Sequence, residues 1–176
     1  MERKDRITFM GKPVTLIGPE LKAGDKAPDF ILVDTNLKEL TLKDFEGKVK
    51  LISVAVSVDT SVCDAQLRRF NEQAASEGKD VVVMNVTVDL PFALKRFCGT
   101  AGIDRAVALS DYRHASFGEN YGVLMKGLRL LARSVFVADA RNTLTYVEIV
   151  PEATHDVNFE GAIKAARKIV SGGKAA

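Results

Sequence analysis

Cys63 has the strongest potential for chemistry in this sequence because of the pattern on either side of it. Strand-forming residues run from 49 to 58 before it, and Leu67, Phe70 and Ala74 follow at the spacing of one helix face. We therefore expect Cys63 in the first turn of a helix that follows a buried strand. Unpaired backbone N–H groups and the helix dipole favour an anion there, and the thiolate is the reactive form of cysteine.

Two other side chains could support a reactive sulfur. Thr60 stands three residues before Cys63 and brings a hydroxyl beside it, and Asp59, Thr60 or Ser61 can cap the helix. An arginine such as Arg133, which opens a predicted strand, could place a cation beside the thiolate. On spacing alone, a small buried cysteine in an ordinary strand–helix turn and an arginine in a surface ion pair are also possible.

Cys98 is the second and last cysteine of the chain. It shares an apolar face with Leu94 and Phe97 in a helix predicted to begin near Pro91 and to end at Gly99. From the sequence alone, an inert packing role and a redox role for Cys98 are both open. The two cysteines and two histidines have no zinc-ligand spacing, and no phosphate-binding glycine motif is present, so we expect no metal and no cofactor.

The composition sets the broad class of the protein. With 176 residues, 47% hydrophobic and 27% charged, the chain is predicted to form one domain over residues 1–176. A net charge of +2 gives no argument for a nucleic-acid partner. No apolar run approaches the roughly 20 residues of a membrane span, and the charged start is no signal peptide. We therefore expect a cytoplasmic protein that contacts neither nucleic acid nor membrane.

The elements that position these residues alternate between strands and helices. We expect an N-terminal β-hairpin at about 6–17 and a single helical turn at 41–45. The active helix should end near Gly78, and residues 117–131 have no clear pattern. The other predicted elements are strands at 30–33, 81–86, 106–109, 133–138 and 143–150, a final helix at 159–170 and a flexible tail at about 171–176. This order fits an α/β fold in which helices flank a mixed sheet.

Several motifs together resemble the thiol peroxidase branch of the peroxiredoxins. They are Asp-Thr-x-Val-Cys at 59–63, Arg-Arg-Phe-Asn-Glu at 68–72, Val-Thr-Leu-Ile-Gly at 14–18, and the segments 89–98 and 131–137. The resemblance covers nearly the whole chain in the family's order. It implies a thioredoxin-like fold, with a central mixed β-sheet flanked by helices and an added N-terminal β-hairpin.

The resemblance also implies roles for single residues. Cys63 would be the peroxidatic cysteine, with Thr60 and Arg133 beside it, in a thiol-dependent peroxidase that reduces hydrogen peroxide and organic hydroperoxides. Cys98 would be the resolving cysteine, forming an intramolecular disulfide after local unfolding, and a thioredoxin-type partner would reduce that disulfide. The family further implies a homodimer. One departure is Val56, which stands where peroxiredoxins usually carry a proline that shapes the pocket.

Two other functions remain open at this stage. The first is a disulfide oxidoreductase of the thioredoxin type, which the missing Cys-x-x-Cys argues against. The second is a thioredoxin-like binding or holdase module that has kept its cysteines, which the loss of the proline at Val56 leaves possible.

Overall fold

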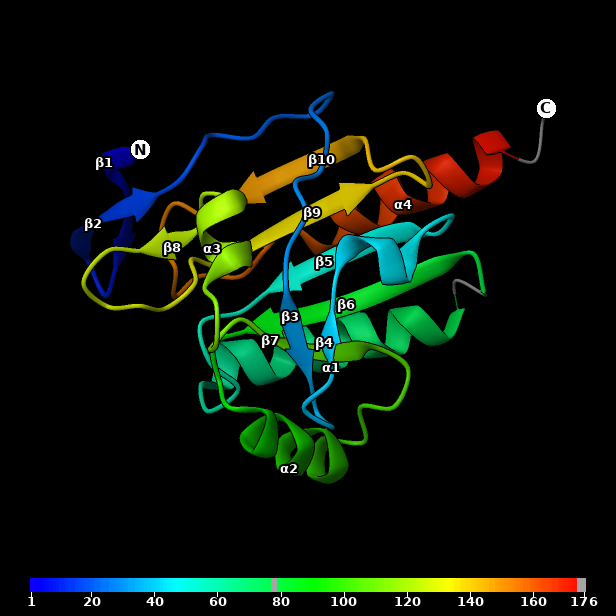
Figure 1. Cartoon of the computed structure of the whole chain (residues 1–176), viewed down its shortest axis with the longest axis horizontal. Helices are drawn as coiled ribbons and strands as arrows, with labels where there is room; N and C mark the ends of the chain where they lie inside the picture. Colours follow the sequence, from blue (N-terminus) through cyan, green and yellow to red (C-terminus); the bar gives the residue numbers. More distant parts are fainter. Residues whose placement is uncertain (77–78, 174–176) are drawn as a thin grey trace.

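The computed structural model describes residues 1–76 and 79–173. Figure 1 shows a large twisted sheet with helices packed against it and a small separate sheet at the N-terminal end. The strands are β1 (Glu2–Phe9), β2 (Lys12–Ile17), β3 (Leu32–Asp34), β4 (Glu39–Leu40), β5 (Val49–Val54), β6 (Val81–Thr87), β7 (Val107–Ser110), β8 (Leu124–Met125), β9 (Ser134–Ala138) and β10 (Leu144–Ile149). The helices are η1 (Leu42–Phe45), α1 (Ser61–Ser76), α2 (Pro91–Ala101), α3 (Ser116–Asn120) and α4 (Phe159–Gly173).

The large sheet has seven strands in the order β10-β9-β5-β6-β7-β3-β4. Strands β5, β6 and β7 are parallel, whereas β9 runs antiparallel to β5. The last residue of β5, Val54, pairs with Val86 of β6 on one side and with Ser134 of β9 on the other. The segments that follow β5 and β6 therefore meet the segment that precedes β9 at one edge of the sheet.

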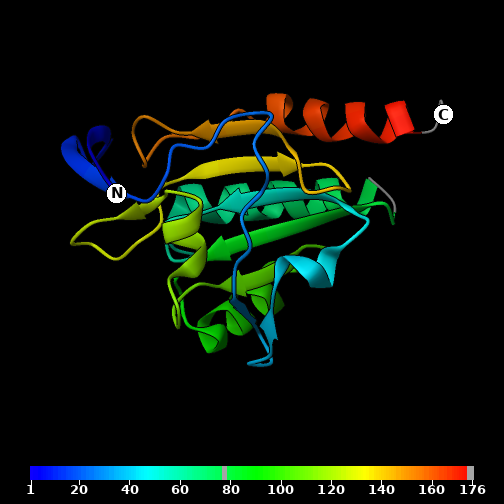
Figure 2. The same cartoon turned by 45° about the horizontal axis from the view of Figure 1, so that its top comes forward.

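Helices α1 and α4 cover one face of this sheet (Figures 1 and 2). Their contact includes the rings of Phe70 and Phe159, whose centroids lie 5.1 Å apart over the valines and leucines of β5, β6 and β9. Burying each such side chain contributes about 1.5–3 kcal/mol. No helix in the described ranges is long and apolar enough to cross a membrane.

The opposite face carries an aromatic cluster. The segment between β2 and β3 crosses this face (Figure 1) and contributes Phe30, which packs against Phe117 and Tyr121 of the α3 region. Phe117 and Tyr121 are stacked 4.1 Å apart, and both meet the edge of Phe136 on β9. The cluster joins residues from distant parts of the chain, so it fixes α3 against the sheet.

The N-terminal strands β1 and β2 form the predicted hairpin and pair with β8 in a three-stranded sheet. The turn residues Met10 and Gly11 have φ values of 52° and 74°. Positive φ at both central residues is the geometry of a tight two-residue turn that matches the twist of the flanking strands. The predicted hairpin is confirmed, and its first strand begins earlier than expected, at Glu2.

The predicted α/β, thioredoxin-like fold is confirmed, but several boundaries differ. Strand β5 ends at Val54 rather than at 58, because the chain after Ala55 turns toward Asp89. Helix α2 passes through Gly99 and ends at Ala101. Gly102 caps it with a φ of 67°, which a glycine adopts without steric cost.

The prediction also missed short elements and the length of the last helix. Strands β4 and β8 and helix α3 had no clear signal in the sequence. Helix α4 extends to Gly173, so residues 171–173 are helical instead of a tail. Gly78 and residues 174–176 lie outside the described residues, and the single-domain interpretation stays a prediction.

Candidate active site

Cys63 lies where the sequence places it, in the first turn of the helix that follows the central strand. Helix α1 begins at Ser61, and the Thr60 carbonyl accepts the backbone N–H of Asp64 at 3.0 Å, which is the first helical hydrogen bond. The Cys63 side chain is fully buried, with 0% of its surface exposed. The sulfur is therefore near the positive end of the α1 dipole and shielded from water.

Arg133 meets Cys63 across the sheet edge. It directly precedes β9, is 1% exposed and donates from Nη2 to the Cys63 sulfur at 3.1 Å. Its Nε donates to the Ala153 carbonyl at 2.9 Å, and its Nη1 donates to the side-chain oxygen of Gln66. All three guanidinium nitrogens have an acceptor, so the cation is held in one orientation against the sulfur.

Gln66 is a site residue that the sequence reasoning missed. It lies one helical turn after Cys63, and its amide nitrogen donates to the Ser53 hydroxyl at 2.8 Å and to the Val54 carbonyl at 3.2 Å. These two bonds leave the amide oxygen facing Arg133. The available signal was a polar side chain beside Leu67 on the buried face of a helix, where an unpartnered amide would be costly.

The loop between β5 and α1 is anchored by Asp89, a second residue that was missed. The Asp89 carboxylate accepts the Ser57 hydroxyl at 2.9 Å and the Val58 backbone N–H at 2.8 Å. Thr60 is exposed, and its hydroxyl donates to the Ser57 carbonyl at 3.2 Å rather than to the sulfur. The loop that carries Thr60 is thus held by the segment that follows the neighbouring strand β6.

A small cavity opens beside the Cys63–Arg133 pair. Its volume is about 220 Å³. It is lined by Phe9, Val56, Thr60, Ser61, Val62, Arg133, Ala153 and Thr154. Thr60 and Arg133 therefore line the same cavity, and Arg133 also contacts the buried sulfur. Val56, in place of the expected proline, is 3% exposed and forms part of the wall.

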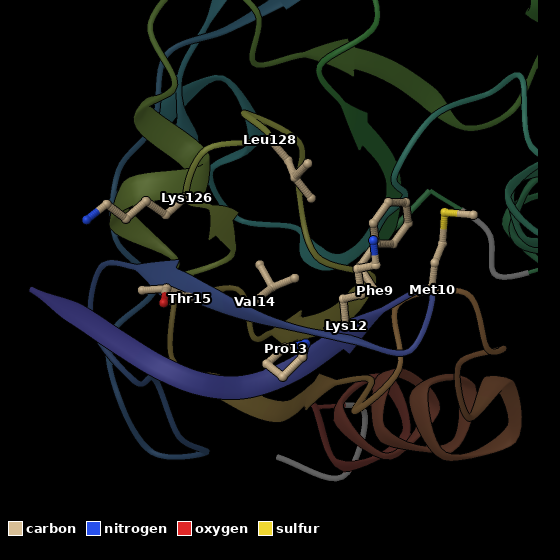
Figure 3. Close-up of a pocket in the computed structure, with 8 residues that line it drawn as sticks. All are labelled: Phe9, Met10, Lys12, Pro13, Val14, Thr15, Lys126 and Leu128. Atoms are coloured by element: carbon tan, nitrogen blue, oxygen red, sulfur yellow. The ribbon is translucent and has the colours of Figure 1, made fainter.

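A larger cavity of about 610 Å³ lies on the N-terminal hairpin (Figure 3). It is lined by Phe9, Met10, Lys12, Pro13, Val14, Thr15, Lys126 and Leu128. Phe9 also lines the small cavity beside Arg133, so the two cavities share one lining residue.

Cys98 lies in helix α2, on a different helix from Cys63. Both cysteines are free thiols. Cys98 is half-buried against the core with its neighbour Phe97, and burial raises the pKa of its thiol. Helix α1 also holds the end of this helix, because Arg68 donates to the Ala101 carbonyl at 2.8 Å. In this conformation Cys98 is a packed side chain, and Cys63 contacts Arg133.

The other titratable residues that the structure describes form no metal centre. Among the described residues, no three His, Cys, Asp or Glu side chains are grouped so that they could hold a metal ion. His114 lies 2.8 Å from a carboxylate oxygen of Glu39 on the surface, and that carboxylate also pairs with Arg113.

Comparison with known proteins agrees with this fold and identifies the family. The family described as Redoxin matches residues 22–163. Thiol peroxidases of Listeria innocua and Bacillus subtilis are 55% and 56% identical over 163 and 164 residues, covering 93% of this chain and 98% of each relative. The crystal structure of a peroxiredoxin-like protein from Aquifex aeolicus superposes with a TM-score of 0.87 at 37% identity, covering 95% of this chain and 99% of that one.

These matches settle the class of protein. The chain belongs to the redoxin family. It carries a buried cysteine at the start of a helix, beside an arginine, on a thioredoxin-like sheet. Within that family it lies in the thiol peroxidase branch of the peroxiredoxins. The protein is therefore an enzyme of the peroxiredoxin type, a thiol-dependent peroxidase, and the binding-module and thioredoxin-type alternatives are set aside.

Proposed function

We propose that this enzyme reduces hydrogen peroxide and organic hydroperoxides with Cys63 as the attacking thiolate. The observation that carries the proposal is the 3.1 Å contact between Arg133 Nη2 and the Cys63 sulfur in the first turn of α1. A fixed guanidinium and the helix dipole both favour a negative charge on that sulfur. A low-dielectric setting strengthens this attraction, since Cys63 is fully buried.

The first step is a displacement at oxygen. The Cys63 thiolate attacks one peroxide oxygen, an S–O bond forms, the O–O bond breaks, and the leaving oxygen departs with a proton as water or an alcohol. Sulfur is oxidised to sulfenic acid, and the peroxide is reduced. Arg133 would stabilise the negative charge on the leaving oxygen, and the Thr60 hydroxyl, in the same cavity wall, would orient the peroxide.

The two cavities suit a hydroperoxide whose organic part can vary in size. The 220 Å³ cavity beside Arg133 is smaller than the roughly 300–1,000 Å³ of pockets for drug-sized ligands. It therefore suits the hydroperoxide group itself. The larger cavity, which shares Phe9 with the smaller one, would offer apolar side chains such as Val14 and Leu128 to an organic tail (Figure 3).

The second step would run through Cys98. Its thiolate attacks the sulfenic sulfur of Cys63, a disulfide forms within the chain, and the hydroxyl group leaves as water. Burial disfavours the Cys98 thiolate, and the two cysteines are free thiols on separate helices, so we expect part of α1 or α2 to unwind first. A thioredoxin-type dithiol would then reduce the disulfide, and we expect the enzyme to work as a homodimer.

A coupled assay tests the proposal. Thioredoxin, its reductase and NADPH are mixed with the protein, and NADPH loss is followed after adding hydrogen peroxide or cumene hydroperoxide. We expect turnover with both substrates and none with Cys63→Ser. Turnover by Cys63→Ser within tenfold of the parent would exclude Cys63 as the nucleophile. Failure of thioredoxin to support turnover, with peroxide still consumed once per subunit, would reject only the proposed reductant.

A further inference from the structure

Glu152 holds the tip of the N-terminal hairpin against the loop that follows β10. One oxygen of its carboxylate accepts the Met10 backbone N–H at 3.1 Å, together with the backbone N–H and hydroxyl of Thr154 at 3.1 and 2.7 Å. The other oxygen accepts the Gly11 backbone N–H at 3.0 Å and the Thr8 hydroxyl at 2.7 Å. A single carboxylate thus receives donors from two segments that are far apart in the sequence.

The backbone continues this connection toward Arg133. The Thr8 N–H donates to the Pro151 carbonyl at 2.7 Å, and the Ala153 N–H donates to the Thr8 carbonyl at 2.9 Å. The Ala153 carbonyl in turn accepts Nε of Arg133 at 2.9 Å. Ala153, whose carbonyl orients the guanidinium, is therefore held in place by the hairpin on one side and by the neighbouring residue Glu152 on the other.

The same contacts place the walls of the small cavity. Phe9, which follows Thr8, lines that cavity, and so do Ala153 and Thr154, which follow Glu152. Hydrogen bonds to the carboxylate lower the pKa of Glu152 to about 2, with the Thr8 hydroxyl as the largest cause. The carboxylate is therefore ionised at every pH at which the enzyme would work, and it stays an acceptor for all its donors.

We propose that Glu152 is a positioning residue for the reaction, which sets the Arg133 guanidinium on the Cys63 sulfur through the Ala153 carbonyl and the hairpin tip. This inference rests on the proposed function for its catalytic consequence. Glu152 does not touch the sulfur or the substrate, and it acts only through the geometry of Arg133 and of the cavity walls.

The test compares Glu152→Gln with a matched control, Glu148→Gln. Glu152→Gln keeps the size of the side chain but turns an amide donor toward N–H groups. Glu148 is also a networked glutamate, accepting the Tyr146 hydroxyl at 2.7 Å and the Asn158 N–H at 3.0 Å, but it does not connect to Arg133. Both changes remove a carboxylate from a local network, so loss of stability alone should affect the two variants alike.

Two readouts separate positioning from stability. The first is the second-order rate of peroxide consumption in a single turnover, and the second is the pH profile of iodoacetamide labelling at Cys63, located by peptide mass spectrometry. We expect Glu152→Gln to slow the peroxide step by roughly ten- to a hundredfold and to shift the labelling profile to higher pH. Glu148→Gln should lower the melting temperature, keep the rate within twofold of the parent and leave the labelling profile at the same pH.

The following results would overturn or support the positioning role of Glu152. An unchanged rate and labelling profile in Glu152→Gln, or the same changes in Glu148→Gln, would overturn the proposal. If Glu152→Gln does not fold, Thr8→Val removes one donor to the carboxylate and should shift both readouts in the same direction by a smaller factor, and no shift would overturn it. If the parent consumes no peroxide, the proposed function fails, and labelling of Cys63 still tests the positioning.

Discussion

Nη2 of Arg133 lies 3.1 Å from the sulfur of Cys63, although 70 residues separate the two in the chain. The contact exists because β9 runs antiparallel beside β5, so the residue before β9 meets the segment after β5. The guanidinium is also bound to Gln66 of α1 and to the carbonyl of Ala153. A cation held by three acceptors cannot turn away from the sulfur at little cost, so the fold fixes the guanidinium against the sulfur.

Arg133→Met should slow the first step of the reaction. The change removes a charge-assisted donor, worth roughly 1.5–3 kcal/mol, which corresponds to about a 10- to 150-fold lower rate. The pH profile of Cys63 labelling should move to higher pH, because nothing replaces the cation. Stopped-flow measurement of peroxide consumption and labelling across pH would check both effects.

Arg113→Met is the matched control for this prediction. Arg113 is a surface residue that pairs with Glu39 at 2.9 Å, so its loss should leave both measurements unchanged. A labelling profile that does not move in Arg133→Met would show that the arginine does not stabilise the thiolate.

Cys98→Ser should retain one fast turnover and lose steady cycling with thioredoxin. Without a second thiol, the sulfenic acid at Cys63 persists and is oxidised further to sulfinic acid by excess peroxide. Non-reducing electrophoresis of the oxidised parent should give a disulfide-closed monomer that runs faster than the reduced parent, and the oxidised variant should show no such faster band. Normal cycling by Cys98→Ser, or a covalent dimer as the main product of the parent, would contradict the role of this cysteine.

Asn71→Ala should speed disulfide formation. Asn71 of α1 holds the segment after α2, because its side-chain oxygen accepts the N–H groups of Arg105 and Ala106 at 2.8 and 2.9 Å and its nitrogen donates to Gly102 at 3.3 Å. Losing these bonds costs about 1–3 kcal/mol of local stability and makes the end of the Cys98 helix easier to open. The rate can be followed by quenching with an alkylating agent and mass spectrometry after one equivalent of peroxide.

Arg69→Ala provides the control for the Asn71 variant. Arg69 contacts Glu160 at 3.0 Å and lies over the Phe159 ring, both on α4, so its removal loosens α1 without touching α2. Disulfide formation that is no faster in Asn71→Ala than in Arg69→Ala would show that opening of this segment does not limit resolution.

Asp111 should make stability depend on pH. It is 1% exposed, and burial raises its pKa to about 6 despite hydrogen bonds from the N–H groups of Phe117 and Gly118. A raised pKa means that the folded state binds the proton more tightly, so the contribution is complete below about pH 3.8 and is lost as the pH rises through about 6. Asp111→Asn cannot titrate, so its stability relative to the parent should increase between about pH 4 and pH 7, by at most about 3 kcal/mol. The free energy of unfolding of both proteins is measured with denaturant at several pH values. A difference between variant and parent that stays constant across this pH range would contradict the raised pKa.

Local patterns in the sequence predicted the position of Cys63. The strand-forming run from 49 to 58 and the helical spacing of Leu67 and Phe70 are signals that depend on neighbouring residues only. The predicted end of α2 at Gly99 was wrong, because the helix continues to Ala101. Gly102 has the positive φ that ends a helix, whereas Gly99 lies inside α2 and has no positive φ.

The rest of the site depends on contacts between distant segments. Arg133 was assigned from the family resemblance, and its meeting with Cys63 requires the strand order, which no local pattern encodes. Gln66, Asp89 and Glu152 were missed because each is a common polar residue whose importance comes only from its partners. The catalytic roles of Cys63 and Arg133 stay predictions until they are measured.

The most direct test of the central claim is the intact mass of Cys98→Ser after one equivalent of hydroperoxide. Cys63 is then the only cysteine left, so no disulfide within the chain can hide the first product. We expect each subunit to gain the mass of one oxygen atom and to react with dimedone at Cys63, as a sulfenic acid does, while the peroxide is consumed. A protein of unchanged mass with the peroxide intact, or an oxygen found on a methionine instead of on Cys63, would contradict the account.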